Sequence, residues 1–172
     1  MAFDGIVTKC VVNELNSVLI NGKIDKIHQP NKNEIVLGIY SGGKNYALDI
    51  CIDSSNCRIN LTTHPKQNPL NAMNFCMLLR KYILGYKISS IKSMDLERLI
   101  IIELDEFDDI DHKRLIVELM GKHSNIILVN NDNIIIDSLR HLTPEANSTR
   151  TILPSKQYQL PKSSKKSIIE CT

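Results

Sequence analysis

Residues 35–52 read IVLGIYSGGKNYALDICI, and this stretch decides the fold class. Apolar residues occupy every second position on both sides of its centre, at Ile35, Leu37, Ile39, Tyr46, Leu48, Ile50 and Ile52. A period of two is typical of strands that bury one face. At the centre, Gly42 and Gly43 readily adopt the positive φ angles that a tight hairpin turn requires. The stretch therefore predicts two antiparallel strands joined by a short turn.

Two helices are predicted on either side of this hairpin. After Asp4, a candidate helix cap, apolar residues recur with helical spacing at Ile6, Val7, Cys10, Val11, Leu15, Val18 and Leu19. The pair Asn21-Gly22 should end this helix. A second helix is predicted over residues 71–84, and it has so little polar surface that we expect other elements to cover it on most sides.

Short strand patterns fill most of the remaining chain. They lie at residues 59–61, 86–94, 98–105, 113–120, 125–130 and 134–141. Some are continuous aliphatic runs, such as 100–102 and 126–129, so both faces of these strands should be partly buried. With two helices, roughly nine strands and connections too short for parallel crossovers, the sequence predicts an α+β domain built on an antiparallel β-sandwich or partly closed barrel.

Length and composition predict one cytoplasmic domain. The 172 residues favour a single domain, which we place at 1–161, and the polar, basic residues 162–172 read as a linker. No stretch approaches the roughly 18 apolar residues that cross a bilayer, and the first residues lack the features of a signal peptide. Five cysteines without a C-x-x-C pair indicate reduced thiols. Because the sequence has no apolar stretch long enough to cross a bilayer, we expect no membrane partner.

The charge distribution is uneven although the net charge is only +2. Residues 103–111 contain six carboxylates and no lysine or arginine, which leaves 21 basic against 13 acidic residues in the rest of the chain. Two interpretations stay open. The run is either a solvated acidic hairpin tip on an ordinary surface, or a segregated loop that leaves a positive face for a nucleic acid elsewhere.

Motifs for catalysis or metal binding are absent from the sequence. There is no glycine-rich nucleotide loop and no H-E-x-x-H motif, and the five histidines are scattered. We expect no metal, no cofactor and no enzymatic activity. Three polar groups stand out. Glu97-Arg98, before an aliphatic run, is typical of a turn that leads into a strand. Gly121-Lys122-His123-Ser124-Asn125 is either a phosphate-binding turn or an ordinary hairpin turn, and Arg80-Lys81 on the second helix serves either phosphate contact or solubility.

Taken together, several segments resemble the amino-terminal (NFACT-N) domain of the RqcH/NEMF/fibronectin-binding protein A family. They are Phe3-Asp4-Gly5, Gly22-Lys23-Ile24, Ile27-His28-Gln29-Pro30, residues 75–81, residues 118–129, Asp137-Ser138, Arg150 and Leu153-Pro154. The resemblance covers about residues 1–161. It implies a fold similar to the amino-terminal domain of formamidopyrimidine-DNA glycosylases.

The resemblance also implies a function in ribosome-associated quality control. Family members bind the large ribosomal subunit that carries peptidyl-tRNA, recruit charged tRNA and support template-free tailing of the nascent chain, with alanine in bacteria. The residues implicated in tailing fall on Asp4, Glu97 and Arg98, with Glu97 standing where the family has aspartate. Candidate RNA phosphate contacts are Arg80, Lys81, Lys122, His123 and Arg150. With no tryptophan and only eight tyrosines and phenylalanines, we expect weak tRNA binding through phosphates rather than stacking.

Two other functions compete with this one. A DNA glycosylase of the related fold would use an amino-terminal proline as nucleophile, and the chain instead begins Met1-Ala2-Phe3-Asp4. A surface adhesin that binds fibronectin, as the older family name suggests, would be expected to carry a signal peptide. The adhesin is therefore the alternative to the RNA-binding function, and the glycosylase is the weaker rival.

Overall fold

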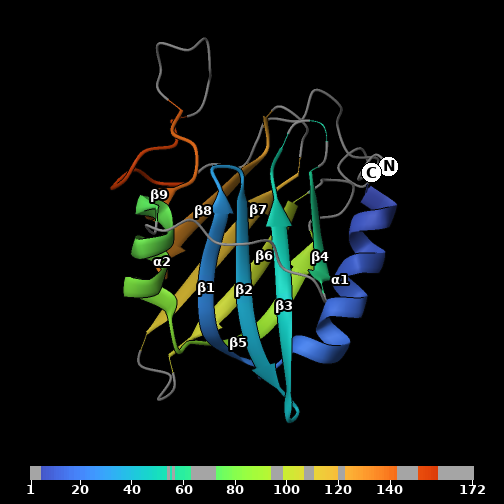
Figure 1. Cartoon of the computed structure of the whole chain (residues 1–172). Helices are drawn as coiled ribbons and strands as arrows, with labels where there is room; N and C mark the ends of the chain where they lie inside the picture. The colour runs from blue at the N-terminus through green and yellow to red at the C-terminus, as the bar shows by residue number, and fades with distance from the viewer. Residues whose placement is uncertain are drawn as a thin grey trace, which may run out of the picture.

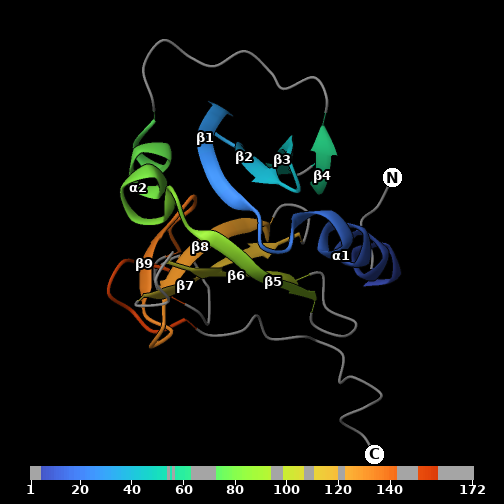
Figure 2. The ribbon, with the colours of Figure 1, turned by 90° about the horizontal axis from the view of Figure 1, so that it is seen from below.

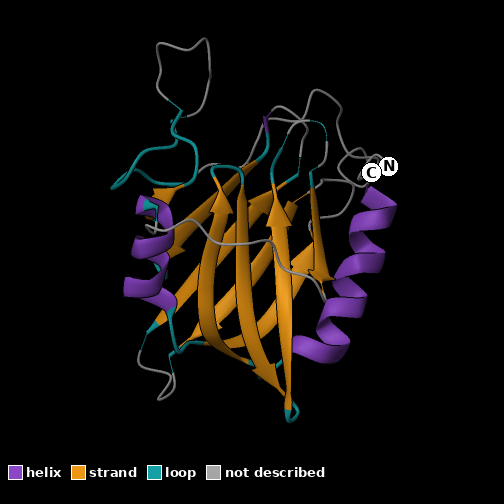
Figure 3. Ribbon diagram, viewed as in Figure 1, coloured by secondary structure: helices purple, strands orange, loops and turns teal. Residues whose placement is uncertain are grey.

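A computed structural model describes residues 5–53, 55, 57–62, 73–93, 99–106, 111–119, 123–142 and 151–158, with the backbone alone at 5–8. Two helices and nine strands follow one another along these residues (Figures 1 and 3). Their bounds are α1 Gly5–Leu19, β1 Lys23–Asn31, β2 Glu34–Ser41, β3 Lys44–Cys51, β4 Arg58–Thr62, α2 Asn74–Ile83, β5 Lys87–Ser93, β6 Leu99–Asp105, β7 His112–Glu118, β8 Asn125–Asn130 and β9 Ile135–Ser138.

The hairpin that the sequence predicts is present as β2 and β3. The strands pair from Glu34 with Cys51 to Ser41 with Lys44, without a break in register. Gly42 and Gly43 form the turn, with φ angles of 58° and 80°. These positive angles are those of a tight two-residue hairpin, and glycine adopts them without the strain that a Cβ would cause.

The nine strands form one antiparallel sheet in the order β4-β3-β2-β1-β5-β6-β7-β8-β9. Strands β1 and β5 pair at Lys23 and Lys87, and backbone hydrogen bonds extend this short junction to the adjoining residues, such as that from the Ile24 nitrogen to the Tyr86 oxygen at 2.8 Å. Beyond the junction the sheet divides into two halves. The half β1–β4 lies over the half β5–β9, and the strands of the two halves cross (Figures 1 and 2). The fold is therefore an open, sandwich-like α+β arrangement, which agrees with the first of the two predicted architectures.

Each helix covers one of the strand edges that this division exposes. Helix α1 lies beside β5, where the Asn16 side chain donates to the Ile91 oxygen at 2.6 Å and accepts from the Ile91 nitrogen at 3.1 Å. Helix α2 lies beside β1 on the opposite side of the molecule (Figure 2). There Nε of Arg80 donates to the backbone oxygen of Ile27 at 2.8 Å. The helices thus satisfy backbone groups that a neighbouring strand would otherwise pair.

Two apolar clusters hold the layers together. The larger lies between the half-sheets and includes Leu37, Leu48, Ile102 and Leu128. The smaller lies on the outer face of β6–β9, where Ile152 and Tyr158 cover side chains such as Ile127 and Val129. Ile126 and Leu128 of β8 belong to the larger cluster, whereas Ile127 and Val129 belong to the smaller one. Strand β8 is therefore buried on both faces, as predicted.

Two predictions about the elements were wrong. Strand β1 was not predicted, because the register shift between Ile24 and Lys26 breaks its alternation. Helix α2 is covered on one face rather than on most sides, since Phe75, Cys76, Leu79 and Ile83 are buried. On its other face Met77 is 54% exposed, and Leu84, just after the helix, is 46% exposed.

Candidate nucleic-acid interface

Helix α2 presents basic side chains to solvent beside strand β1. Arg80 and Lys81, both predicted as phosphate contacts, lie exposed in the last turn of the helix. Arg80 Nε donates to the backbone oxygen of Ile27 at 2.8 Å, and its Nη2 lies 3.4 Å from Nδ1 of His28. Arg80 therefore ties the helix to the strand through one nitrogen while the residue remains exposed.

His28 reports a positive potential at this place. Burial lowers the pKa of His28, and the charges of Arg80 and then Lys26 lower it further. Two cations that act on one imidazole without an opposing carboxylate disfavour its protonated form. The lowered pKa favours the uncharged form of the His28 ring, next to the charged side chains that lower it.

The cations of this region lack acidic partners in the described part of the chain. The ion pairs found there involve Arg58, His112, Lys113, Arg114 and His141, and none involves Lys26, Arg80 or Lys81. We call Lys26, His28, Arg80 and Lys81 the α2–β1 basic surface. Its uncompensated charge is what a phosphate-binding surface requires.

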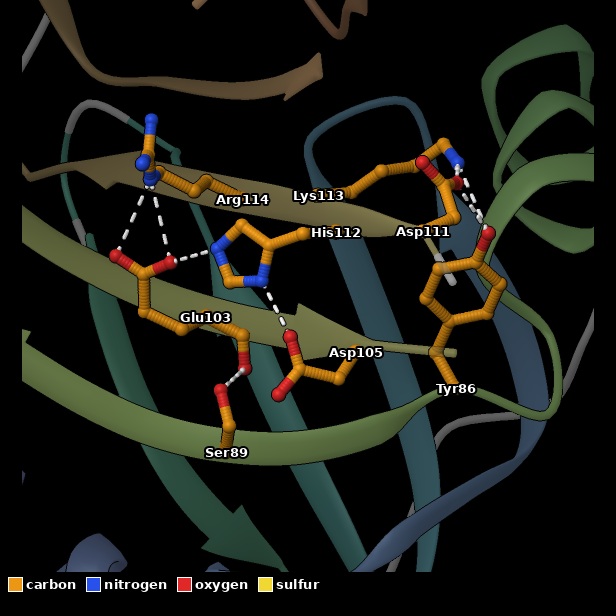
Figure 4. Close-up of polar contacts among 8 residues, drawn as sticks. All are labelled: Tyr86, Ser89, Glu103, Asp105, Asp111, His112, Lys113 and Arg114. Atoms are coloured by element: carbon orange, nitrogen blue, oxygen red, sulfur yellow. Dashed lines mark hydrogen bonds and ion pairs between the residues drawn. The ribbon is translucent and has the colours of Figure 1, made fainter. Parts of the chain in front are cut away.

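The acidic run, by contrast, is paired with strand β7 (Figure 4). Nε of Arg114 lies 3.2 Å from both carboxylate oxygens of Glu103. The His112 ring lies between Glu103 and Asp105, with one nitrogen bonded to each carboxylate. Over its described residues the acidic run is therefore not segregated from basic side chains, while Asp108 and Asp109 lie outside the described residues.

Asp111, the last carboxylate of the run, belongs to a second group at the end of α2. It accepts hydrogen bonds from the Tyr86 hydroxyl, at 2.6 Å, and from Lys113 (Figure 4). The Lys113 ammonium lies 4.9 Å from the Tyr86 ring centroid and 5.9 Å from that of Tyr82. Burial lowers the pKa of Lys113, opposed by the charge of Glu106. This group fixes the chain that follows α2 rather than offering a cation to solvent.

A buried ionic group lies on the outer face of β2–β4. Nη2 of Arg58 is 2.7 Å from Asp49 and 3.6 Å from Glu34, and both carboxyl residues are buried. Burial raises the pKa of Asp49 to about 7, as do the hydrogen bond and the charge of Glu34, while Arg58 opposes the shift. A protonated Asp49 leaves one positive and one negative charge in the group, which is the arrangement that burial favours.

The predicted phosphate-binding turn at Gly121–Asn125 divides into an exposed and a structural part. His123 is exposed, whereas Ser124 and Asn125 are buried. The Asn125 side chain donates to the Arg140 oxygen at 2.8 Å and accepts from the Arg140 nitrogen at 2.9 Å. Asn125 thus orders the chain after β9, a role that its place in a long strand-like run did not reveal. Lys122 lies outside the described residues.

The remaining predicted site residues also lie outside the described residues: Asp4, Glu97, Arg98 and Arg150. Their assignments stay predictions, as does the boundary at residue 161. Within the described part of the chain, no three histidine, cysteine, aspartate or glutamate residues form a group that could hold a metal ion. Neither helix there is long and apolar enough to cross a membrane.

Comparison with known proteins places the chain in a family. Residues 4–172 match the family described as NFACT N-terminal and middle domains. The Rqc2 homolog RqcH of Bacillus subtilis is 42% identical over 165 residues, which cover 94% of this chain and 29% of that protein. The archaeal Rqc2 homolog aRqcH of Methanocaldococcus jannaschii is 36% identical over 88% of this chain and 22% of its own length. The chain therefore spans less than a third of these relatives.

Solved structures agree with this assignment. The N-terminal domain of the fibronectin-binding protein PavA from Streptococcus pneumoniae superposes with a TM-score of 0.89 at 36% identity, over 99% of this chain and 67% of that one. The fibrinogen binding protein from Staphylococcus aureus gives a TM-score of 0.82 at 34% identity, over 95% of this chain and 58% of that one. The predicted resemblance is thus confirmed, and the chain belongs to the NFACT N-terminal family.

Proposed function

We propose that this chain is the RNA-contacting module of a ribosome-associated quality-control factor. The observation that carries the proposal is the α2–β1 basic surface, where Arg80 and Lys26 both depress the pKa of His28 and no described carboxylate pairs with either cation. Family membership supports the same function, because relatives named as Rqc2 homologs match over most of this chain.

In this proposal the chain contacts tRNA. The full-length factor binds the large ribosomal subunit that carries peptidyl-tRNA. Asp4, Glu97 and Arg98 support template-free extension of the nascent chain, with alanyl-tRNA as the donor. Arg80, Lys81, Lys122, His123 and Arg150 contact phosphates. The module works in the cytoplasm and binds RNA without catalysing a reaction of its own.

The names of two structural neighbours favour a second candidate, a surface protein that binds fibronectin or fibrinogen. Cell fractionation separates the two candidates. A quality-control factor should sediment with large ribosomal subunits, whereas an adhesin should be recovered from the cell surface and should bind immobilised fibronectin without RNA.

The direct test is the salt dependence of tRNA binding by this chain. Each phosphate contact should add about −0.7 to −0.9 to the slope of log affinity against log salt. Lys81→Ala should remove about one such contact. Lys92→Ala, an exposed lysine on β5, is the matched control and should leave the slope unchanged. Absence of tRNA binding, or an affinity independent of salt, would contradict the proposal.

A further inference from the structure

Strands β1 and β2 carry a row of basic residues beside an exposed aromatic ring on the outer face of the first half-sheet. Lys23 pairs with Tyr40, Lys26 with Gly38 and His28 with Val36. Residues directly opposite in an antiparallel pair point to the same face. The inner face is marked by Ile35, Leu37 and Ile39 in the larger cluster, so the alternate residues of β2 face outward.

Among the aromatic residues that the structure describes, Tyr40 stands out by its exposure. Its side chain is 50% exposed, whereas Phe75, Tyr86 and Tyr158 are buried. An exposed tyrosine ring is a surface on which a base can stack. Asn45, directly opposite on β3, is exposed as well.

Gly38 places no side chain on the surface next to the Tyr40 ring. It lies two residues before Tyr40 on the same face, and a Cβ added there would come within 3.0 Å of the Lys26 Cβ. A larger residue would therefore displace Lys26 and stand between the lysine and the ring. With glycine, no side chain stands beside Lys26 in the strip from Lys23 to His28, which is roughly 15 Å long at the usual rise per residue, whereas Val36, opposite His28, is buried.

The charges of this strip are not cancelled within the described residues. Neither Lys23 nor Lys26 forms an ion pair there, and Arg80 extends the row from α2 through its contact with His28. Asp25 is exposed at the register shift between Ile24 and Lys26. Cations in a row with a free aromatic face form the combination that binds unpaired nucleic acid, in which phosphates meet the cations and a base stacks on the ring.

We propose that the outer face of β1 and β2 binds an unpaired stretch of RNA, with Tyr40 as the stacking platform for one base and Lys23, Lys26 and Arg80 as phosphate contacts. This inference rests on the proposed RNA-contacting function and narrows it to single-stranded or loop RNA. It differs from the expectation that the chain binds RNA through phosphates rather than stacking, because that expectation rested on aromatic content and not on the exposure of Tyr40.

The test compares a short oligouridylate that cannot form a duplex with an RNA duplex of the same length, each titrated with the chain. Tyr40→Ala should weaken binding of the unpaired RNA about tenfold without changing its salt dependence, because stacking releases no counterions. Duplex binding should be unaffected, since its bases are already stacked. Tyr40→Phe keeps the ring and should restore most of the affinity.

Lys26→Ala gives the complementary result. It should lower the slope of log affinity against log salt by about 0.7 on the unpaired RNA, while Lys92→Ala should leave the slope unchanged. If Tyr40→Ala binds unpaired RNA as well as the unchanged chain does while tRNA binding persists, the stacking platform is wrong and the proposed function survives. If Tyr40→Ala weakens both RNAs equally, the preference for unpaired RNA is wrong. Failure of the unchanged chain to bind tRNA would instead overturn the proposed function itself.

Discussion

At the scale of single residues, exposure and partners decide which polar side chains are available to a ligand. Arg80 and Lys81 follow one another in the sequence, yet Arg80 also holds Ile27 of β1 while Lys81 makes no hydrogen bond among the described residues. Ser124 and Asn125 stand beside exposed His123 and are buried. The sequence pattern identified these residues as polar and clustered. It could not distinguish the exposed residues from the structural ones, because that distinction depends on contacts with residues distant in the chain.

Asp49 predicts a specific dependence of stability on pH. Its pKa is raised to about 7 in the folded chain, so the folded state binds a proton that the unfolded state releases near pH 3.8. The stabilisation is therefore fully present below pH 3.8 and is lost as the pH rises through 7. Asp49→Asn, which resembles the neutral acid, should flatten this change and exceed the unchanged chain in stability at pH 8. Urea unfolding between pH 4 and pH 8 measures it.

A control variant separates this local effect from a general effect of charge. Asp132→Asn removes a carboxylate from an exposed turn and serves as that control. If Asp49→Asn shows the same fall in stability with rising pH as the unchanged chain, Asp49 is not the titrating group.

Glu97 and Arg98 should matter to tailing more than to docking. In the full-length protein, Arg98→Ala and Glu97→Ala should abolish most nascent-chain extension while co-sedimentation with large subunits persists. Arg98→Lys keeps the charge but loses the planar fork, so a severe defect indicates a bidentate contact and a mild one a simple phosphate contact. A parallel loss of extension and co-sedimentation, in proportion to lost folded protein, would show that the pair is structural.

At the scale of elements, each helix packs against a strand edge that is exposed where the sheet divides into two halves. Helix α1 was predicted from its spacing of apolar residues, since that pattern is local. Its partner strand β5 was predicted too, but the pairing of Asn16 with Ile91 was not, because the two residues are 75 positions apart. Strand β1, by contrast, was not predicted, because the register shift interrupts the alternation of its apolar residues. Its pairing with β2 is what identifies it as a strand.

Asn16→Ala tests whether α1 acts as a substitute for a missing strand. The change leaves the Ile91 nitrogen and oxygen without their partner, so we expect a loss of roughly 2 kcal/mol in the free energy of unfolding. The Ile91 amide should also exchange faster with solvent. Asn13→Ala, exposed on the same helix, should change stability little. Equal losses of unfolding free energy in the two variants would mean that the contact between Asn16 and Ile91 does not stabilise the edge of β5.

At the scale of the whole molecule, Arg140 joins the two half-sheets. Its guanidinium donates to the Ser124 oxygen at 3.3 Å, to the Asn33 side chain at 3.1 Å and to the Ile52 oxygen at 3.3 Å. Asn33 and Ile52 belong to the first half and Ser124 to the second. The sequence predicted a two-layer arrangement of strands, but this connection depends on how the layers are placed and had no sequence signal.

Arg140→Lys should destabilise the chain by about 2 kcal/mol, because a single ammonium cannot reach acceptors on both halves in the geometry of the planar fork. Thermal unfolding measures the loss. Arg114→Lys is the matched control, since Arg114 forms a partly exposed ion pair with Glu103 and the exchange there should cost little. A cost for Arg140→Lys no larger than that of the control would argue against a connection between the halves.

The central claim is that RNA approaches the α2–β1 basic surface, and the ring of His28 reports on it most directly. Nuclear magnetic resonance titration of the His28 ring should give a pKa below the usual range in the free chain, because burial, Arg80 and Lys26 lower it. With tRNA bound, nearby phosphates favour the imidazolium, so the pKa should rise and binding should strengthen as the pH falls. The ring signals of His141, which pairs with Asp137, should not respond to tRNA. A His28 titration that is identical with and without saturating tRNA would contradict the claim.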